Sequence, residues 1–228
     1  MWVLTETAAY ALREDAAGLT AEKRLEAAAP LEADQGRDVC VIAMEGNRLA
    51  WWRDGDRLET ETQLTERITS LLILRGAAPA EILIGTEPPE IYYLQQGGQP
   101  ERMDHFSRLA CRKDWYTPWG GPPAVRSLAQ TPDGTVYADI HVGSIMRSAD
   151  AGRSWEPVTP DLNEDVHQVA TTRAGAERVY ANTADAVYVS HDRGRSWRHR
   201  PFPTEQRYGR ALAVHPEDPD CLLASVSN

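Results

Sequence analysis

Short runs of β-branched and aromatic residues alternate with turn residues along much of the chain. The runs Thr135–Ala138 and Ile145–Arg147 stand on either side of a turn, and Arg178–Ala181 and Val187–Val189 repeat the arrangement. Short runs of this kind between turn residues predict strands. None of these segments shows the ten or more residues at a 3.6-residue period that a helical repeat needs. The pattern therefore predicts an all-β fold.

An eight-residue string occurs twice, 42 residues apart. Residues 148–155 read SADAGRSW and residues 190–197 read SHDRGRSW, so both fit the pattern S-x-D-x-G-x-S-W. A period of about 40 to 50 residues is typical of propellers and of helical arrays. Because the surrounding runs predict strands, the repeat favours a β-propeller.

Weaker copies of the unit lie on both sides of these two. Residues 81–93 and 38–52 each contain two strand-like runs at similar spacing, and residues 2–19 contain a fainter copy. Residues 220–225 match the first strand of a further unit. Residues 11–34, rich in Ala and Glu, predict either a helix or a decorated loop between blades.

These units predict one propeller domain, residues 1–228, made of four-stranded antiparallel blades. We expect about five blades and the start of a sixth, with the two clear units at about 120–160 and 163–205. The domain is expected to be incomplete at its C-terminal end, as part of a longer ring of six or seven blades. A propeller avoids exposed strand edges by closing its ring, so we expect a truncated one either to self-associate through its open blade edge or to be less stable.

The two strings resemble Asp-boxes, the repeats of sialidases and related β-propellers (the BNR family). Residues 115–123 and 165–169 also resemble bacterial sialidase-like and photosystem-assembly-factor-like propellers of the WD40/YVTN/BNR-like superfamily. The resemblance implies a structural turn away from the propeller axis. The residues that carry it are Ser148, Asp150, Gly152, Trp155, Ser190, Asp192, Gly194 and Trp197.

Each residue type in the string suits a tight turn. A carboxylate at Asp150 or Asp192 can accept backbone N–H bonds across a hairpin, and glycine suits a position with positive φ. The tryptophans offer large apolar faces for packing between sheets. A calcium loop needs oxygen ligands at alternating positions that end in Glu, and this pattern is missing, so we expect no metal and no cofactor.

Composition excludes several partners. The 228 residues include 24 Lys and Arg against 34 Asp and Glu, a formal net charge of −10. An acidic chain without a basic run argues against nucleic acid and against an anionic membrane surface. The N-terminus does not read as a signal peptide, and the widely spaced Cys40, Cys111 and Cys221 predict small core residues rather than disulfides. We expect a reducing, cytoplasmic location.

Candidate ligand-binding residues come from aligning the innermost strands of successive units. Residues 125–129, 166–170 and 209–213 align at offsets that match the repeat, which places Arg126, His167 and Arg210 at equivalent positions. The unit upstream places Ser70 there. These positions lie where the strands begin, at the mouth of the axial channel.

This set of side chains suits an anion. Arg126 and Arg210 can hold a carboxylate in a bidentate way, and His167 can donate a hydrogen bond or act as an acid or base. Asp165 would orient His167, and His141 faces the same region if its loop joins the inner strands. The alternative is that these residues only line a wet channel and pair with carboxylates.

Aromatic residues precede the first of these strands. Trp115, Tyr116 and Trp119 can form a platform for a sugar ring or another apolar ligand. The alternative is a rigid loop, residues 119–123, whose rings seal the channel edge. Trp119 is the ligand-binding candidate among the three.

Two functions remain open. A sialidase-like enzyme needs an arginine triad, an acid, a Tyr nucleophile and its Glu partner, and the Arg-Ile-Pro-type motif of that family is missing. Asp165 and Asp139 are the only carboxylates expected at the mouth, and Asp165 and His167 are the catalytic candidates. We expect a non-enzymatic scaffold that binds a protein or glycan ligand or acts in assembly through its axial or loop face. The alternative is an exo-acting, carboxylate-recognising sialidase-like glycoside hydrolase, intact or decayed.

Overall fold

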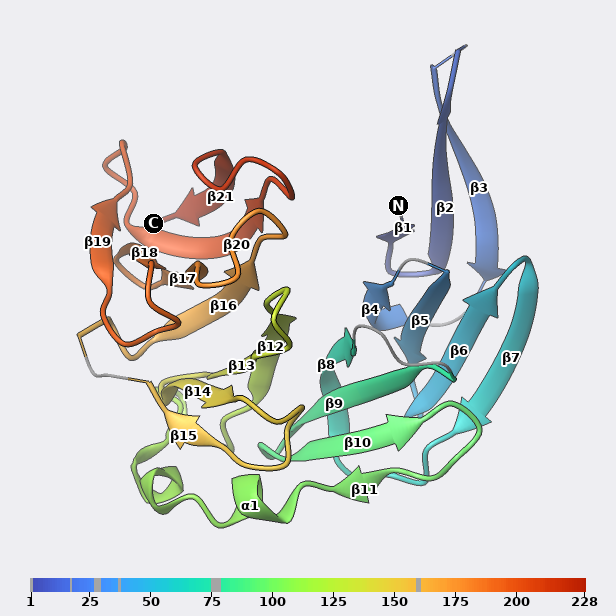
Figure 1. The fold of residues 1–228 in the computed structure, drawn as a ribbon. Coiled ribbons are helices and arrows are strands. Elements are labelled where there is room, and N and C mark those ends of the chain that lie inside the picture. Colours follow the sequence, from blue (N-terminus) through green and yellow to red (C-terminus); the bar gives the residue numbers. More distant parts are fainter. Residues whose placement is uncertain (1, 17, 27–29, 37, 75–78, 159–160) are drawn as a thin grey trace.

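The computed structural model describes residues 2–16, 18–26, 30–36, 38–74, 79–158 and 161–228. Within these residues, six antiparallel sheets follow one another in chain order (Figure 1). Four sheets have four strands, the first has three and the last has two. The expected all-β propeller of about five blades and the start of a sixth is therefore confirmed.

Each sheet is an up-and-down meander whose strands are neighbours in sequence. The first sheet contains β1 (Trp2–Leu4), β2 (Ala8–Asp15) and β3 (Gly18–Glu26). The second contains β4 (Pro30–Gln35), β5 (Val39–Met44), β6 (Arg48–Arg53) and β7 (Asp56–Glu61). The third contains β8 (Arg67–Ile73), β9 (Glu81–Glu87), β10 (Ile91–Gln95) and β11 (Glu101–Arg102).

The remaining sheets contain the two clear sequence repeats. The fourth contains β12 (Val125–Gln130), β13 (Val136–Ile140), β14 (Ser144–Ser148) and β15 (Glu156–Pro157). The fifth contains β16 (Val166–Thr171), β17 (Val179–Thr183), β18 (Ala186–Ser190) and β19 (Arg198–Pro201). The last contains β20 (Tyr208–Val214) and β21 (Leu222–Ser227). A short helix α1 (Asp104–Ser107) and a 3-10 turn, Ala110–Asp114, connect the third sheet to the fourth.

The hydrophobic core lies in layers between neighbouring sheets. Trp51 of the second sheet packs in one buried cluster with Ile82 and Ile84 of the third, and Trp155 of the fourth reaches a cluster with Leu83 of the third. Alternate residues of a strand point to opposite faces, so a blade inside the stack is apolar on both faces. This explains why the inner blades read as runs of hydrophobic residues rather than as a strict alternation.

The first strand of each blade is the innermost one. Strand β4 contacts β8, β8 contacts β12, β12 contacts β16, and β16 contacts β20. In Figure 1 the blades fan around these strands as an arc, with the first sheet (blue) and the last sheet (red) at its two open ends.

A β-bulge interrupts each of these five inner strands, β4 between Pro30 and Glu32 and the other four at equivalent positions. The register with the second strand shifts by one residue, so that Thr69, Arg126, His167 and Arg210 are extra residues in β8, β12, β16 and β20. A bulge re-aims the side chain that it adds. This register corrects one part of the alignment, because Thr69 and not Ser70 is equivalent to Arg126.

The residue after the bulge ties neighbouring inner strands together. Ser70 Oγ donates to the Val125 carbonyl over 2.9 Å, Ser127 Oγ accepts from Val169 N over 2.8 Å, and Gln168 Oε1 accepts from Leu212 N over 2.6 Å. These bonds join one blade to the next at the axis. The bulge residue Thr69 adds to them, because its Oγ1 donates to the same Val125 carbonyl over 2.7 Å.

The two repeated strings form turns on the outer side of the fourth and fifth sheets, here called the rim turns (residues 148–155 and 190–197). Asp150 Oδ1 accepts from Ser154 N over 2.8 Å, and Asp192 makes the same bond with Ser196 N, also over 2.8 Å. Gly152 has φ +92° and Gly194 φ +81°, a conformation that favours glycine. Both turns pack on the preceding blade, since a Cβ at Gly152 would contact the Leu83 side chain.

Three sequence expectations are corrected by the fold. Residues 11–34 form neither a helix nor a decorated loop: their described part belongs to β2, β3 and β4. Residues 220–225 contribute to β21, the second strand of its sheet, because residues 208–214 already supply the first. Cys40 is buried, but Cys221 is exposed and so is not a core residue.

Candidate functional site

Candidate residues from three blades meet at the end where the inner strands begin. His141 follows β13, Asp165 precedes β16, His167 is the bulge residue of β16, and Tyr208 opens β20. With Trp119 and Arg210, these residues are here called the mouth cluster. Arg126, the bulge residue of β12, adjoins it.

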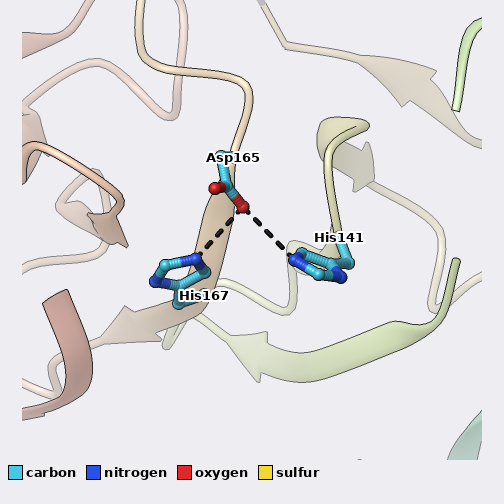
Figure 2. Close-up of side chains that lie close together, drawn as sticks. All are labelled: His141, Asp165 and His167. Carbon is cyan, nitrogen blue, oxygen red and sulfur yellow. Dashed lines mark hydrogen bonds and ion pairs between the residues drawn. The ribbon is translucent and has the colours of Figure 1, made fainter. Parts of the chain in front are cut away.

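Asp165 lies between the two histidines (Figure 2). Its Oδ1 atom is 3.1 Å from His167 Nε2 and 3.4 Å from His141 Nε2. Both histidines are buried, whereas Asp165 is partly exposed. One carboxylate oxygen thus contacts both the loop after β13 in the fourth blade and strand β16 in the fifth.

His167 also contacts the next blade. Its Nδ1 atom lies in hydrogen-bonding contact with the Gly209 carbonyl oxygen of β20. A Cβ at Gly209 would overlap Asn182 Oδ1, so only glycine lets β20 approach this closely. Both ring nitrogens of His167 therefore face oxygen acceptors.

Aromatic rings run in a row from the fourth blade to the last. The ring centroids of Trp119 and His141 are 4.7 Å apart, and those of His141 and His167 are 6.1 Å apart. The ring centroids of His167 and Tyr208 are 4.4 Å apart. The guanidinium carbon of Arg210 lies 4.5 Å from the centre of the Tyr208 ring, a cation–π contact. Trp119 is 71% exposed and ends the row in solvent.

The charges around Asp165 set the ionisation of the cluster. Burial alone would raise the pKa of Asp165, but the hydrogen bond with His167 and the charges of the two histidines and Arg126 outweigh it and hold this pKa below its usual range. Burial, followed by the nearby Arg126 charge, lowers the pKa of His141. At neutral pH the cluster therefore contains an ionised carboxylate beside a neutral His141.

Asp139 is not at the mouth, contrary to expectation. Its side chain is completely buried, and Ser127 Oγ donates to its Oδ1 inside the blade. Burial, only partly offset by this bond, raises the pKa of Asp139 to about 6. Asp139 was expected at the end of a loop, but it lies in β13, the second strand of its blade, at a core position. It therefore cannot touch a ligand at the mouth.

The other predicted residues separate into exposed and buried ones. Arg126 is half-buried, and Arg210 is exposed with its Nε donating to Ser227 Oγ over 3.0 Å. Trp115 is a core residue that packs against Phe106, with ring centroids 5.6 Å apart. Only Tyr116 and Trp119 of the three aromatic candidates face solvent.

Tyr208 is the cluster member that sequence reasoning missed. It occupies the position in β20 that Asp165 occupies just before β16, one residue ahead of Gly209. The alignment that found Arg210 could have found Tyr208 two residues earlier. The residue type hid it, because a Tyr at the start of a strand is an ordinary strand former.

A second feature lies at the opposite end of the inner strands. A cavity of about 1000 Å³ opens there, and its lining includes Leu74, Gln130, Thr171 and Arg173. None of the mouth cluster lines it. The two features are therefore separate sites on the same set of strands.

The fold of this chain is a β-propeller. Residues 143–228, less than half of the chain, match the family of sortilin, neurotensin receptor 3. The match begins at β14 of the fourth sheet and continues through the fifth and last sheets, so it includes His167 and Tyr208.

Two solved structures are similar in fold. An ancestral GH74 enzyme aligns with a TM-score of 0.57 and 17% identity, over 95% of this chain and 28% of that protein. YCF48 bound to D1 peptide aligns with a TM-score of 0.53 and 17% identity, over 80% of this chain and 55% of that protein. The chain thus spans 28% of the first relative and 55% of the second.

A comparison of the sequence with curated proteins gave no match. Within the described part of the chain, the helices are too short and too polar for any of them to span a bilayer.

Proposed function

We propose that this chain is a non-enzymatic binding propeller whose mouth cluster holds a carboxylate-bearing segment of a partner protein. The observation that carries the proposal is the row of rings from Trp119 to Tyr208, which begins with an exposed indole and ends under the Arg210 guanidinium. Trp, Tyr and Arg are the residue types that contribute most binding energy at protein interfaces.

The charge of the mouth favours an acidic ligand. The whole chain has a formal net charge of −10, yet two arginine bulge residues lie on either side of His167 in neighbouring blades. Arginine binds carboxylates through two parallel hydrogen bonds. A free C-terminus or an acidic side chain in an extended peptide matches both the arginines and the aromatic row.

A peptide ligand is consistent with one relative. YCF48, which shares the fold at 17% identity, is described as bound to D1 peptide. This supports a peptide as the class of ligand to test.

The experiment is a peptide array probed with the full chain. Each peptide is displayed with a free C-terminal carboxylate and, as its pair, with a C-terminal amide. We expect a subset of free-carboxylate peptides to bind, with their amide pairs at least tenfold weaker. Trp119→Ala should lose this binding, whereas Leu58→Ala, which removes an exposed apolar side chain from β7, should keep it. Equal binding to both peptide series, or equal binding by both variants, would overturn the proposal.

A glycoside hydrolase remains the second candidate because the GH74 enzyme shares the fold. Glycosidases usually place two carboxylates across the cleft. Asp139 is buried in its blade and so does not supply the second one beside Asp165. Turnover of an aryl glycoside by the wild type that disappears in both Arg126→Ala and Asp165→Ala would favour the hydrolase and displace the scaffold.

A further inference from the structure

We propose that His141, Asp165 and His167 form a binding site for one divalent transition-metal cation of the Zn²⁺ class. The inference goes beyond the proposed function, because a cation can bind here with or without a partner peptide. Each of the three residues offers one ligand atom, and these atoms all lie within 4.8 Å of one another. Two imidazoles and one carboxylate are a ligand set that zinc accepts.

The distances suit a cation between the three side chains (Figure 2). Asp165 Oδ1 is 3.1 Å from His167 Nε2 and 3.4 Å from His141 Nε2. In a tetrahedral zinc site with bonds of about 2.0–2.1 Å, neighbouring ligand atoms are about 3.3 Å apart. Both distances from Asp165 Oδ1 lie within a few tenths of an ångström of that value. Only the distance between the two imidazole nitrogens therefore has to shorten when a cation binds.

The hydrogen bonding of His167 gives an independent reason. A neutral imidazole carries one N–H and one lone pair, but the two nitrogens of His167 face the Gly209 carbonyl and the Asp165 carboxylate, which are both acceptors. If Nδ1 donates to the carbonyl, the space between Nε2 and the carboxylate oxygen holds either a proton or a cation. A Zn²⁺ ion takes the place of that proton and is bound by both groups. The Nδ1–H to carbonyl bond is also the outer contact that commonly orients a metal-bound histidine.

His141 gives the second reason. Its side chain is 4% exposed, and within the described residues its Nε2 atom is buried without a hydrogen bond. The Trp119 ring packs 4.7 Å away on this imidazole and helps to hold it. A buried nitrogen without a hydrogen bond is costly, and a metal–nitrogen bond removes that cost.

Three protein ligands leave part of the coordination shell open. In zinc sites with three protein ligands, the remaining position holds water or another oxygen ligand. Asp165 is the partly exposed member of the three, so this open position lies toward the mouth. A nearby positive charge, Arg126, opposes the cation, since it already acts on both His141 and Asp165.

The test is a calorimetric titration of Zn²⁺ alone into the reduced full chain. We expect one Zn²⁺ per chain, with affinity reduced 10- to 100-fold in Asp165→Asn and in His167→Gln. The matched control is His199→Gln, because His199 Nε2 also lies near an aspartate, 3.8 Å from Asp185 Oδ2, but these side chains are 49% and 42% exposed. This control should bind zinc as the wild type does. Arg126→Gln should bind zinc several-fold more tightly, because it removes a like charge.

A second measurement guards against variants that fail to fold. Zn²⁺ should raise the melting temperature of the wild type and of His199→Gln, but not that of Asp165→Asn, whose side chain keeps its shape. The proposal is overturned if the wild type takes up no zinc, or if Asp165→Asn and the control bind it equally. Neither result affects the peptide proposal, because the two proposals predict opposite effects of Arg126→Gln. The substitution should weaken peptide binding and should strengthen zinc binding.

Discussion

The rim turns and the mouth cluster come from the same repeat but differ in how much the copies vary. The two rim turns share the same hydrogen bonds among their Ser, Asp and Gly residues: Gly152 N to Ser148 Oγ is 2.8 Å, and Gly194 N to Ser190 Oγ is 2.7 Å. The inner-strand bulges agree in backbone register but carry Thr69, Arg126, His167 and Arg210. The rim repeats one structural solution, whereas the bulges present a different side chain from each blade.

This difference separates stability from binding. Each rim turn closes a blade and packs on its neighbour, so its loss should unfold the protein. The bulge residues Arg126 and Arg210 are not buried and add side chains at the mouth without a place in the strand register, so their loss should leave the fold nearly intact. Substitutions in the rim turns, in the blade core and at the mouth test this separation.

The largest effect is expected at the rim, for Trp155→Ala. Trp155 is buried between the third and fourth sheets, and its Nε1 donates to the Gly152 carbonyl over 2.7 Å. Removing a buried Trp costs about 3–5 kcal/mol of unfolding free energy. Urea unfolding should show this loss, while the fraction that stays folded binds peptide as before. A loss below about 1 kcal/mol would contradict the role given to the rim.

A smaller effect with an unusual pH dependence is expected for Asp139→Asn. Burial raises the pKa of Asp139 to about 6, so the folded state holds its proton longer than the unfolded state does. Stability should therefore fall as pH rises from about 4 to 6, and remain low above that range. The Asn variant, which resembles Asn182 at the equivalent place in β17, should lack this fall and be more stable at pH 7 by up to about 3 kcal/mol. Identical stability curves for the two proteins would refute the assignment.

The opposite slope is expected for a rim aspartate. Burial alone would raise the pKa of Asp192, but its bonds from Ser196 and Ser190 lower it to about 2. Its contribution is thus present above about pH 4 and is lost as pH falls toward 2. Asp192→Asn should cost about 1 kcal/mol at pH 7, as hydrogen bonds to a carboxylate weaken, and its acid unfolding should be shallower. Chemical unfolding at pH 7 and pH 3 measures both; parallel curves would show that Asp192 adds nothing.

The smallest effect on stability is expected for Trp119→Ala. Because this indole is 71% exposed, its loss should change the unfolding free energy by less than about 0.5 kcal/mol. Peptide affinity should nevertheless fall about tenfold or more. A melting curve and a titration on the same sample test both statements. If the variant loses stability and affinity together, Trp119 supports the fold rather than the ligand.

The sequence predicted the parts of the molecule that repeat. The strands, the rim turns and the inner-strand alignment all follow from local patterns with a period near 42 residues, and the alignment predicted equivalent positions for Arg126, His167 and Arg210. The sequence did not predict which side chains next to loops are buried inside a blade. Asp139 and Trp115 are both buried, although both lie beside loops. It also missed the approach of His141, Asp165 and His167 as possible metal ligands, because only the packing of adjacent blades brings them together.

Self-association through a blade edge remains a prediction that follows from the arc in Figure 1. Strand β21 has exposed Leu222 and Leu223, and an exposed strand edge favours pairing with another chain. Sedimentation of the 228-residue chain at increasing concentration should show a concentration-dependent dimer that Leu223→Lys reduces. A monomer at all concentrations would exclude pairing through this edge.

The most direct test of the separation uses two adjacent residues of β12. Arg126 is a bulge residue at the mouth, whereas Ser127 bonds Val169 N of the next blade and the buried Asp139. Titration of a free-carboxylate peptide from the array, paired with urea unfolding, should show Arg126→Gln with at least tenfold weaker binding and unchanged stability. Ser127→Ala should show unchanged binding and about 1–2 kcal/mol lower unfolding free energy. If both substitutions change the same property, the bulges do not separate binding from folding, and the central claim is wrong.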